Sequence, residues 1–144
     1  MNTFLFEIKK LHPDAIKPSR GTPKSAAIDL YACFFDIIPS GSVKVIKSGI
    51  AVNIHDGYCG RIASRSSLAM QGIDVVGGLI DPDYTGELCI IMRNSSKTDF
   101  KINKADRIAQ MTVDPVGYPI VVEVQELSKC ITERGDKGLG STGK

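Results

Sequence analysis

The 144-residue sequence contains no tryptophan, and aromatic residues make up only 6% of it. No stretch approaches the roughly 18 consecutive apolar residues of a transmembrane helix, so we expect no membrane-spanning segment. Basic and acidic side chains nearly balance, at 18 and 16, and the net charge is +2. So small an excess predicts neither a nucleic-acid partner nor a membrane-surface partner. The length suits one domain, which excludes a large multidomain machine.

Metal-binding patterns are also lacking. The four cysteines, Cys33, Cys59, Cys89 and Cys130, are widely scattered, form no C-x-x-C pair and are accompanied by only two histidines. This spacing argues against a zinc site and favours reduced thiols, mostly buried as small hydrophobic residues. The first ten residues alternate polar and apolar side chains, unlike the continuous apolar stretch of a signal peptide. We therefore expect an intracellular protein of the cytoplasm or the nucleus.

Glycine and proline are abundant instead, with 14 and 7 residues. They separate short runs with strand character, at residues 43–47, 49–54, 58–63, 88–93, 100–102, 108–113 and 120–124. A spacing of about ten residues between such runs predicts an all-β sandwich or barrel. The sequence His55-Asp56-Gly57 predicts a hairpin turn, with residues 58–63 as the returning strand. One short helix is expected over residues 66–71, with a serine cap and Gly72 as its stop.

Two segments suit phosphate binding. In residues 134–143, glycines free the backbone N–H groups to face an anion, Ser141 and Thr142 add hydroxyl donors, and Arg134 suits a bidentate phosphate contact. A solvated, mobile terminus is the alternative, whereas a P-loop is excluded because Ser141 stands at its lysine position. Residues 60–69 run from a strand into a serine-rich helix start, which is either a polyphosphate cradle or an ordinary helix cap.

Three aspartates are candidates for proton transfer or ion pairing. Asp81 follows the apolar Leu79 and Ile80, so part of its surroundings is expected to be dry enough to orient it as a base. The alternative is an ordinary turn with Tyr84 as a half-buried strand residue. Asp29 and Asp106 stand in similar settings. An aspartate next to an arginine is usually part of a structural ion pair, which we expect for Asp106 and the adjacent arginine.

Taken in order, five segments resemble the five motifs of the trimeric all-β dUTP pyrophosphatases, the dUTPases. They are residues 26–30, 60–69, 78–87, 105–110 and 134–143. The third matches in full, and the others depart at Ala27, Ser64, Ser67, Ala105 and Leu139, where the family has Gly, Pro, Gly, Gly and Phe. The resemblance implies a distorted jelly-roll barrel of short strands with one short helix over residues 1–133. A flexible glycine-rich arm, residues 134–144, would close over the nucleotide.

The resemblance also implies an activity, the hydrolysis of dUTP to dUMP and pyrophosphate by in-line attack of water on the α-phosphorus. Asp81 would be the base, while Asp29 and Gln110 would act through the water shell of Mg²⁺ bound to the triphosphate, with no direct protein ligand. Substrate-binding residues would be Arg65, Ser66, Ser67, Gly78, Ile80, Tyr84, Arg134, Leu139, Gly140, Ser141 and Thr142. Uracil specificity would come from a hairpin around residues 77–84. The family works as a homotrimer with active sites shared between subunits.

The departures from the motifs carry expectations of their own. Ala27 and Ala105 fit only where the backbone has negative φ. Ser64 in place of proline should loosen the turn before Arg65. Leu139 removes an aromatic residue that stacks on uracil in the family, so a weaker lid or a higher Michaelis constant is expected. Two alternatives remain, a dUTPase-like regulatory or interaction protein that has lost turnover, and a dCTP deaminase relative, against which the complete third motif argues.

Overall fold

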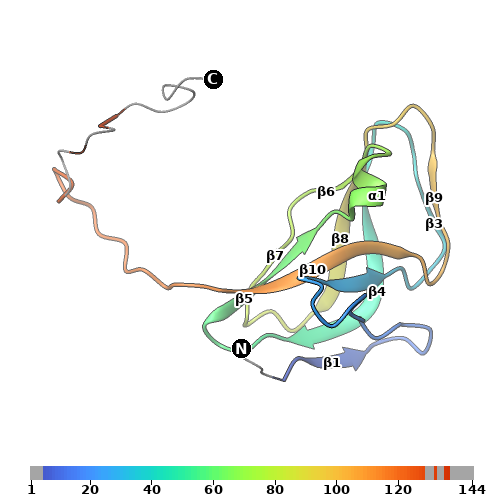
Figure 1. Ribbon diagram of the computed structural model, residues 1–144, viewed down its shortest axis with the longest axis horizontal. Coiled ribbons are helices and arrows are strands. Elements are labelled where there is room, and N and C mark those ends of the chain that lie inside the picture. The colour runs from blue at the N-terminus through green and yellow to red at the C-terminus, as the bar shows by residue number, and fades with distance from the viewer. Residues whose placement is uncertain (1–4, 129–131, 133–134, 137–144) are drawn as a thin grey trace.

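The computed structural model of the chain describes residues 5–128, 132, 135 and 136, and nearly all of its regular structure is β (Figure 1). The first sheet has the order β1 (Glu7–Lys10), β4 (Val43–Asn53), β8 (Glu87–Asn94) and β6 (Ile73–Val75). The second has the order β2 (Ile28–Tyr31), β10 (Arg107–Pro115), β5 (Tyr58–Ala63) and β7 (Leu79–Ile80). A third, two-stranded sheet pairs β3 (Asp36–Ile38) with β9 (Phe100–Ile102), and the helix is α1 (Ser66–Ala69). The predicted all-β architecture with one short helix is confirmed.

The hydrophobic core draws on all three sheets. Strand β8 shows the alternation that builds it, because Leu88, Ile90 and Met92 are fully buried whereas Ile91 is 40% exposed. The second sheet adds Leu30 and other buried residues to the same cluster. Since successive side chains of a strand point to opposite faces, each large sheet has one face on the core, and the outer faces are left for the candidate site.

The expected strands are largely confirmed, and two of them, β5 and β9, have the predicted bounds. The runs at residues 43–47 and 49–54 join into the single strand β4, whose register shifts between Lys47 and Ala51. Gly49 occupies this irregularity at a φ of +70°. A Cβ at Gly49 would lie 2.6 Å from the Cys33 Sγ, so only glycine fits there.

The hairpin predicted at His55-Asp56-Gly57 is wrong. A turn does form, because the Tyr58 N–H donates to the His55 carbonyl at 3.1 Å and Gly57 has a φ of +82°. However, β4 already pairs with β1 on one edge and β8 on the other. Strand β5 therefore crosses into the second sheet and pairs with β10 and β7.

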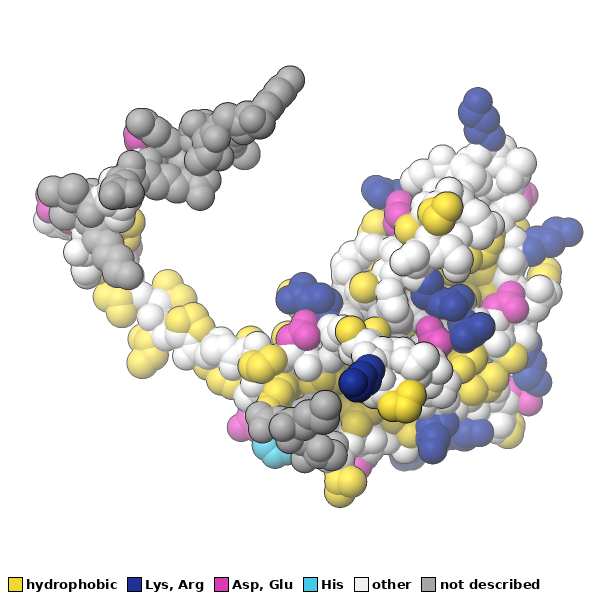
Figure 2. Space-filling view, in the orientation of Figure 1, with side chains coloured by type: hydrophobic (Ala, Val, Ile, Leu, Met, Phe, Trp, Pro, Cys, Tyr) yellow, Lys and Arg dark blue, Asp and Glu magenta, His cyan; other side chains and the backbone are white. Residues whose placement is uncertain are grey.

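The strand predicted over residues 120–124 is also wrong, because no strand is present there. After Val116, whose N–H donates to the Gly57 carbonyl at 2.9 Å, the chain leads away from the barrel (Figure 1). Ile120 and Val121 are 91% and 92% exposed, and hydrophobic side chains follow this segment in Figure 2. The β-branched run has strand character but lies against no neighbouring strand in the described part of the chain.

Candidate active site

Three motifs that are far apart in the sequence meet on the second sheet. Asp29 of β2 lies opposite Gln110 of β10, and Gln110 lies opposite Ala63 at the end of β5. The Gln110 Nε2 donates to the Ser64 carbonyl at 2.8 Å, which joins β10 to the turn after β5. A cavity of about 250 Å³ lies here, and Asp29, Ala63 and Gln110 are among its lining residues. The structure thus brings together candidates from the first, second and fourth motifs.

Helix α1 follows this turn and differs from the expected one. Its N-cap is Arg65, which has extended backbone angles and makes no side-chain capping bond, so Ser66 is the first helical residue and the serine cap is wrong. The Arg65 carbonyl accepts the Ala69 N–H at 2.9 Å. The helix is shorter than the predicted residues 66–71, because it ends at Ala69 with Met70 as its C-cap, and Gly72 follows in a turn at a φ of +77°. The side chains of Ser66 and Ser67 are left exposed to solvent.

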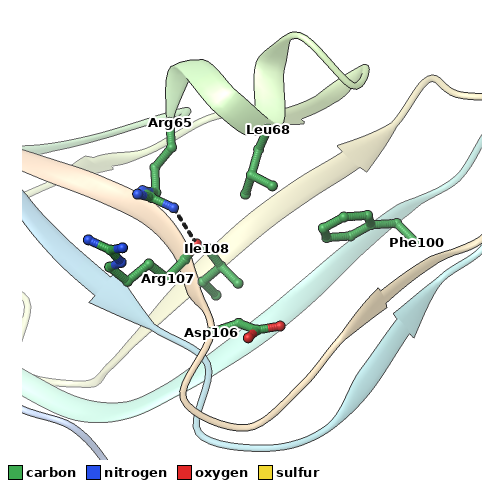
Figure 3. Close-up of a pocket in the computed structure, with 6 residues that line it drawn as sticks. All are labelled: Arg65, Leu68, Phe100, Asp106, Arg107 and Ile108. Atoms are coloured by element: carbon green, nitrogen blue, oxygen red, sulfur yellow. Dashed lines mark hydrogen bonds between the residues drawn. The ribbon is translucent and has the colours of Figure 1, made fainter.

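The Asp29 carboxylate lies between two arginines. Its Oδ1 is 3.3 Å from the Arg65 Nε and its Oδ2 is 3.4 Å from the Arg107 Nη1. The Arg65 Nη1 also donates to the Arg107 carbonyl at 3.1 Å (Figure 3). The Asp29 side chain is only 15% exposed, so these pairs are partly shielded from water. We call Asp29, Arg65, Arg107 and Gln110 the arginine cluster.

Arg107 is the functional candidate that sequence reasoning missed. The predicted pair of Asp106 with Arg107 is wrong, because the Asp106 Oδ2 accepts the Asn103 N–H at 2.8 Å and Arg107 reaches Asp29. Arg107 begins β10, and adjacent side chains of an extended chain point apart. The signal that could have identified Arg107 was its place inside the fourth motif, next to the residues already selected.

A second cavity, of about 260 Å³, adjoins the arginine cluster between α1 and the start of β10. Figure 3 shows Arg65 and Arg107 on one side of it, with Leu68 and Phe100 on the other and Asp106 below. The arginine cluster has two guanidinium groups and one carboxylate, Asp29, so it carries a net positive charge, although Asp106 adds a second carboxylate to the cavity lining. The guanidinium side of the cavity, rather than the cavity as a whole, suits an anionic ligand.

The turn leading into β10 contains an unexpected strain. Ala105 has a φ of +73°, so the expectation of negative φ is wrong there, and Ala105 is the only such non-glycine residue in the described ranges. Ala27 does not have positive φ, as expected. The Ala105 N–H donates to the Ala32 carbonyl at 2.9 Å, which helps to hold this conformation. Ser64, which was expected to loosen its turn, makes a bond that proline could not make, because the Ser64 Oγ accepts the Val75 N–H at 2.8 Å.

The loop with Asp81, residues 77–87, forms a separate part of the site, which we call the Asp81 loop. The expected hairpin is wrong, because β7 pairs with β5 and not with β8. Gly78 has a φ of +112°, and its carbonyl accepts the Ile62 N–H at 2.8 Å. A Cβ at Gly78 would come within 2.6 Å of the Ile62 carbonyl oxygen, so this position requires glycine.

Tyr84 folds back on its own loop. Its N–H donates to the Asp81 carbonyl at 3.1 Å, and its hydroxyl donates to the Glu87 carbonyl at 2.8 Å. The Asp81 side chain is exposed in the single chain, so the expectation of dry surroundings is wrong there. A cavity of about 240 Å³ lies beside it, lined by Leu79, Ile80, Asp81, Tyr84, Glu87 and Cys89. Burial raises the pKa of the Cys89 thiol, and the Glu87 carboxylate raises it further, so this thiol is neutral at pH 7.

The single chain keeps these two parts of the site apart. Ile80 lies opposite Gly60, whereas Gln110 lies opposite Ala63, which is three positions further along β5. At a strand rise of about 3.3 Å per residue, this separation is roughly 10 Å before Asp81 is reached. The cavity of about 250 Å³ beside Asp29 and Gln110 and the cavity of about 240 Å³ beside Asp81 share no lining residue.

Some candidate residues fall elsewhere. Arg134, Leu139, Gly140, Ser141 and Thr142 lie outside the described residues. Among the residues that are described, no group of three or more His, Cys, Asp or Glu side chains could hold a metal ion, and no helix could span a membrane. Cys33, Cys59 and Cys89 are free thiols, although only Cys33 is fully buried.

The fold and the site define the class of protein. The dUTPase of Staphylococcus bacteriophage 80alpha with dUpNHpp matches 99% of this chain and 100% of its own, at a TM-score of 0.93 and 27% identity. The dUTPase of phage phi11 of S. aureus, described with a structural Mg(II) ion, matches 87% of this chain and 99% of its own, at a TM-score of 0.81 and 23% identity. The architecture is therefore the jelly roll of the dUTPases.

Sequence comparison identifies the family. The dUTPase family model matches residues 14–143. The deoxyuridine 5'-triphosphate nucleotidohydrolase of Camelpox virus (strain CMS) is 43% identical over 129 residues, which cover 90% of this chain and 86% of the viral protein. The chain belongs to the dUTPase family, and the resemblance seen in its motifs is confirmed.

Proposed function

We propose that the chain hydrolyses dUTP to dUMP and pyrophosphate through in-line attack of water on the α-phosphorus. The observation that carries the proposal is the arginine cluster, in which residues from three separate motifs meet beside exposed serine side chains. The name of the curated relative supports the same activity. Neither a regulator without turnover nor a dCTP deaminase is favoured by the comparisons.

The arginine cluster would bind the phosphates. Arg65 presents a planar guanidinium, Ser66 and Ser67 present hydroxyl groups, and Gln110 presents an amide beside them. Ser66 would lie near the bridging oxygen of the leaving pyrophosphate. Phosphoryl transfer depends on positioning and charge neutralisation more than on covalent help, so a set of fixed donors suits it.

The Asp81 loop would bind the nucleoside and supply the base. Asp81 would orient the attacking water and take its proton, because its exposed carboxylate can accept one. Backbone groups of Gly78 and Ile80 would hydrogen-bond the uracil edge, and Tyr84 would lie against the deoxyribose. A wrong base would leave a buried group unpaired, at a cost of about 1–3 kcal/mol.

The residues present fit Mg²⁺ that is carried in on the triphosphate. Mg²⁺ usually keeps several waters and binds through one or two carboxylates plus phosphates. The described part of the chain offers the Asp29 carboxylate and the neighbouring Gln110 amide, and no cluster that would hold the ion alone. When bound, the ion would neutralise phosphate charge, while Asp29 and Gln110 would hydrogen-bond the water around it.

We further propose a homotrimer with active sites shared between subunits. The separation of the Asp81 loop from the arginine cluster in one chain supports this, because a second chain would be needed to complete the site. The exposed hydrophobic side chains of residues 118–127 also indicate a surface that another subunit covers. Residues 1–133 would form the barrel. Residues 134–144 would form the arm, with Arg134, Ser141 and Thr142 against the phosphates and Leu139 and Gly140 over the base.

A nucleotide panel tests the activity. Pyrophosphate release is measured with Mg²⁺ and either dUTP, dCTP, dTTP or UTP, with chelator as a control. We expect release from dUTP alone, and no release at micromolar enzyme would contradict the proposal. Ammonia release from dCTP would instead indicate the deaminase. Deleting residues 134–144 should lower turnover steeply while the melting temperature is kept, and unchanged turnover would refute the proposed arm.

Mixing two inactive variants tests the shared site. Asp81→Asn subunits and Arg65→Ala subunits are unfolded and refolded together, then separated from monomers by size. If Asp81 and Arg65 of one site come from different subunits, random mixing should restore about one quarter of the sites. If both residues come from the same subunit, the mixture stays inactive.

A further inference from the structure

Ser64 stands between the end of β5 and Arg65, where the second dUTPase motif has proline. The residue is half-buried and joins two neighbouring segments. Its Oγ accepts the Val75 N–H at 2.8 Å, and its carbonyl accepts the Gln110 Nε2 at 2.8 Å. A proline would keep the carbonyl but would lack the Oγ, so it would leave the Val75 N–H without this partner.

The bond to Val75 is made at a free edge of the first sheet. Strand β6 is the last strand of the first sheet, and it pairs only with β8. The Val75 N–H is therefore satisfied by a side chain of the turn that follows β5 rather than by a strand. The bond thus joins the edge of the first sheet to the turn that leaves the second sheet, where the proposed phosphate-binding turn begins.

The same edge continues into the Asp81 loop. Two residues separate Val75 from Gly78, whose carbonyl accepts the Ile62 N–H at 2.8 Å. Besides the pairing of β5 with β7, the segment before Arg65 is thus tied to the segment before Asp81 by this backbone bond and by the Ser64 side-chain bond. Only the Ser64 bond can be removed without changing the backbone.

We propose that Ser64 is a positioning residue that holds the turn carrying Arg65, Ser66 and Ser67 in register with Gln110 and β6. Its effect on substrate passes through those residues, and it makes no contact with the nucleotide itself. The inference rests on the proposed function, since it concerns how that site is held. It also assigns a role to a residue at which this chain departs from its family.

Three substitutions separate the hydroxyl from the backbone. Ser64→Ala removes the Oγ, Ser64→Thr keeps it, and Ser64→Pro installs the residue of the family motif. We expect kcat/KM for dUTP to fall about fivefold to tenfold in the alanine and proline variants, as for other small displacements of positioning groups. The threonine variant should keep near-normal values. Ser42→Ala is the matched control, because it removes a serine hydrogen bond to the Pro39 carbonyl in a turn outside the site.

Binding distinguishes positioning from mere stability. The dissociation constants of dUpNHpp and dUMP are measured for each folded variant. If Ser64 positions the phosphate-binding turn, the alanine variant should bind dUpNHpp about fivefold more weakly and dUMP nearly as before. Equal weakening of both ligands with a matching loss of melting temperature would overturn the proposal, as would a proline variant equal to or better than the parent.

The unmodified chain is assayed first, so that the two proposals fail separately. If it does not hydrolyse dUTP, the proposed function fails, whereas the ratio of the two dissociation constants still tests Ser64. If it does hydrolyse dUTP and Ser64→Ala leaves both kinetics and binding unchanged, only the role of Ser64 fails.

Discussion

The arginine cluster and the Asp81 loop carry comparable numbers of candidate residues, but the protein holds them in different ways. In the arginine cluster, Asp29 bonds to two arginines and Gln110 bonds across strands, so each side chain is fixed by another side chain or by a carbonyl. In the Asp81 loop, the bonds around Asp81 involve the backbone and Tyr84, and the Asp81 carboxylate is exposed. The only side-chain ion pair of this loop among the described residues is that of Glu87 with Lys47, at the end of the loop.

The difference fits the two chemical tasks that we propose for these regions. Binding a polyphosphate requires fixed positive charge, and the cluster supplies it before substrate arrives. A base must be free to accept a proton, and an ion pair with arginine would oppose protonation. The placement of Arg65 and Arg107 at Asp29, with no such partner at Asp81 in the described part of the chain, fits the proposed roles.

The largest expected effect tests this division directly. Asp81→Asn should lower kcat for dUTP by about 10³-fold, because the amide cannot take the proton from water. Because Asp81 is exposed, the unfolding free energy should change by no more than about 0.5 kcal/mol, and dUpNHpp should still bind. Stopped-flow measurement of proton release and thermal unfolding check both expectations. Asp56→Asn, in the turn before β5, serves as the control, and turnover of Asp81→Asn at the parent rate would show that another group is the base.

The second prediction breaks the backbone of the Asp81 loop. Gly78→Ala forces a side chain into a φ of +112°, with its Cβ 2.6 Å from the Ile62 carbonyl oxygen. We expect a loss of about 2–3 kcal/mol in unfolding free energy and a strong rise in KM for dUTP. The matched control is Gly41→Ala, which has a φ of +72° but no atom within 4 Å of the added Cβ. If both variants lose equal stability, the contact with Ile62 carries no energy.

The strands show how much of the fold could be predicted from the sequence. Local patterns predicted β5 and β9 with their bounds, because alternation and turn residues act within a few positions. The turn at Gly57 was also foreseen, but its topology was not, since β4 had both edges filled by strands from distant parts of the chain. Residues 120–124 have the composition of a strand without a partner to pair with.

The candidate site shows the same limit. Matching motifs selected Asp29, Arg65 and Gln110, and the structure brings them together. The motif match could not show that Arg107 bonds to Asp29 rather than to Asp106, because that depends on the direction in which the side chain leaves β10. Nor could the motif match show that Ala105 has positive φ, since a motif records residue types and not backbone angles.

The third prediction weakens the arginine cluster while the Asp81 loop is untouched. Arg107→Gln removes one of the two guanidinium groups that contact the Asp29 carboxylate. We expect kcat/KM for dUTP to fall about tenfold, because the cluster is then positioned less well. The ion pair is half-exposed, so stability should change by less than about 1 kcal/mol. Arg107→Lys should restore part of the activity. Arg61→Gln, which removes the 3.0 Å pair with Asp114 in the same sheet, is the control and should keep normal kinetics. Equal kinetic losses at Arg61 and Arg107 would show that sheet stability alone is being measured.

The smallest expected effect comes from relieving backbone strain at Ala105, close to the arginine cluster. Ala105 adopts a φ of +73° just before Arg107, and an alanine in this region costs about 1–2 kcal/mol relative to an unstrained backbone. Glycine relieves the strain but adds backbone freedom to the unfolded chain, so Ala105→Gly should stabilise the protein by about 0.5–1 kcal/mol. For a chain of this size, the melting temperature should rise by about 2–3 °C. Kinetics should stay normal if the Ala32 carbonyl already holds the turn through the Ala105 N–H. A drop in kcat/KM with higher stability would mean instead that the strain itself helps to place Arg107 against Asp29.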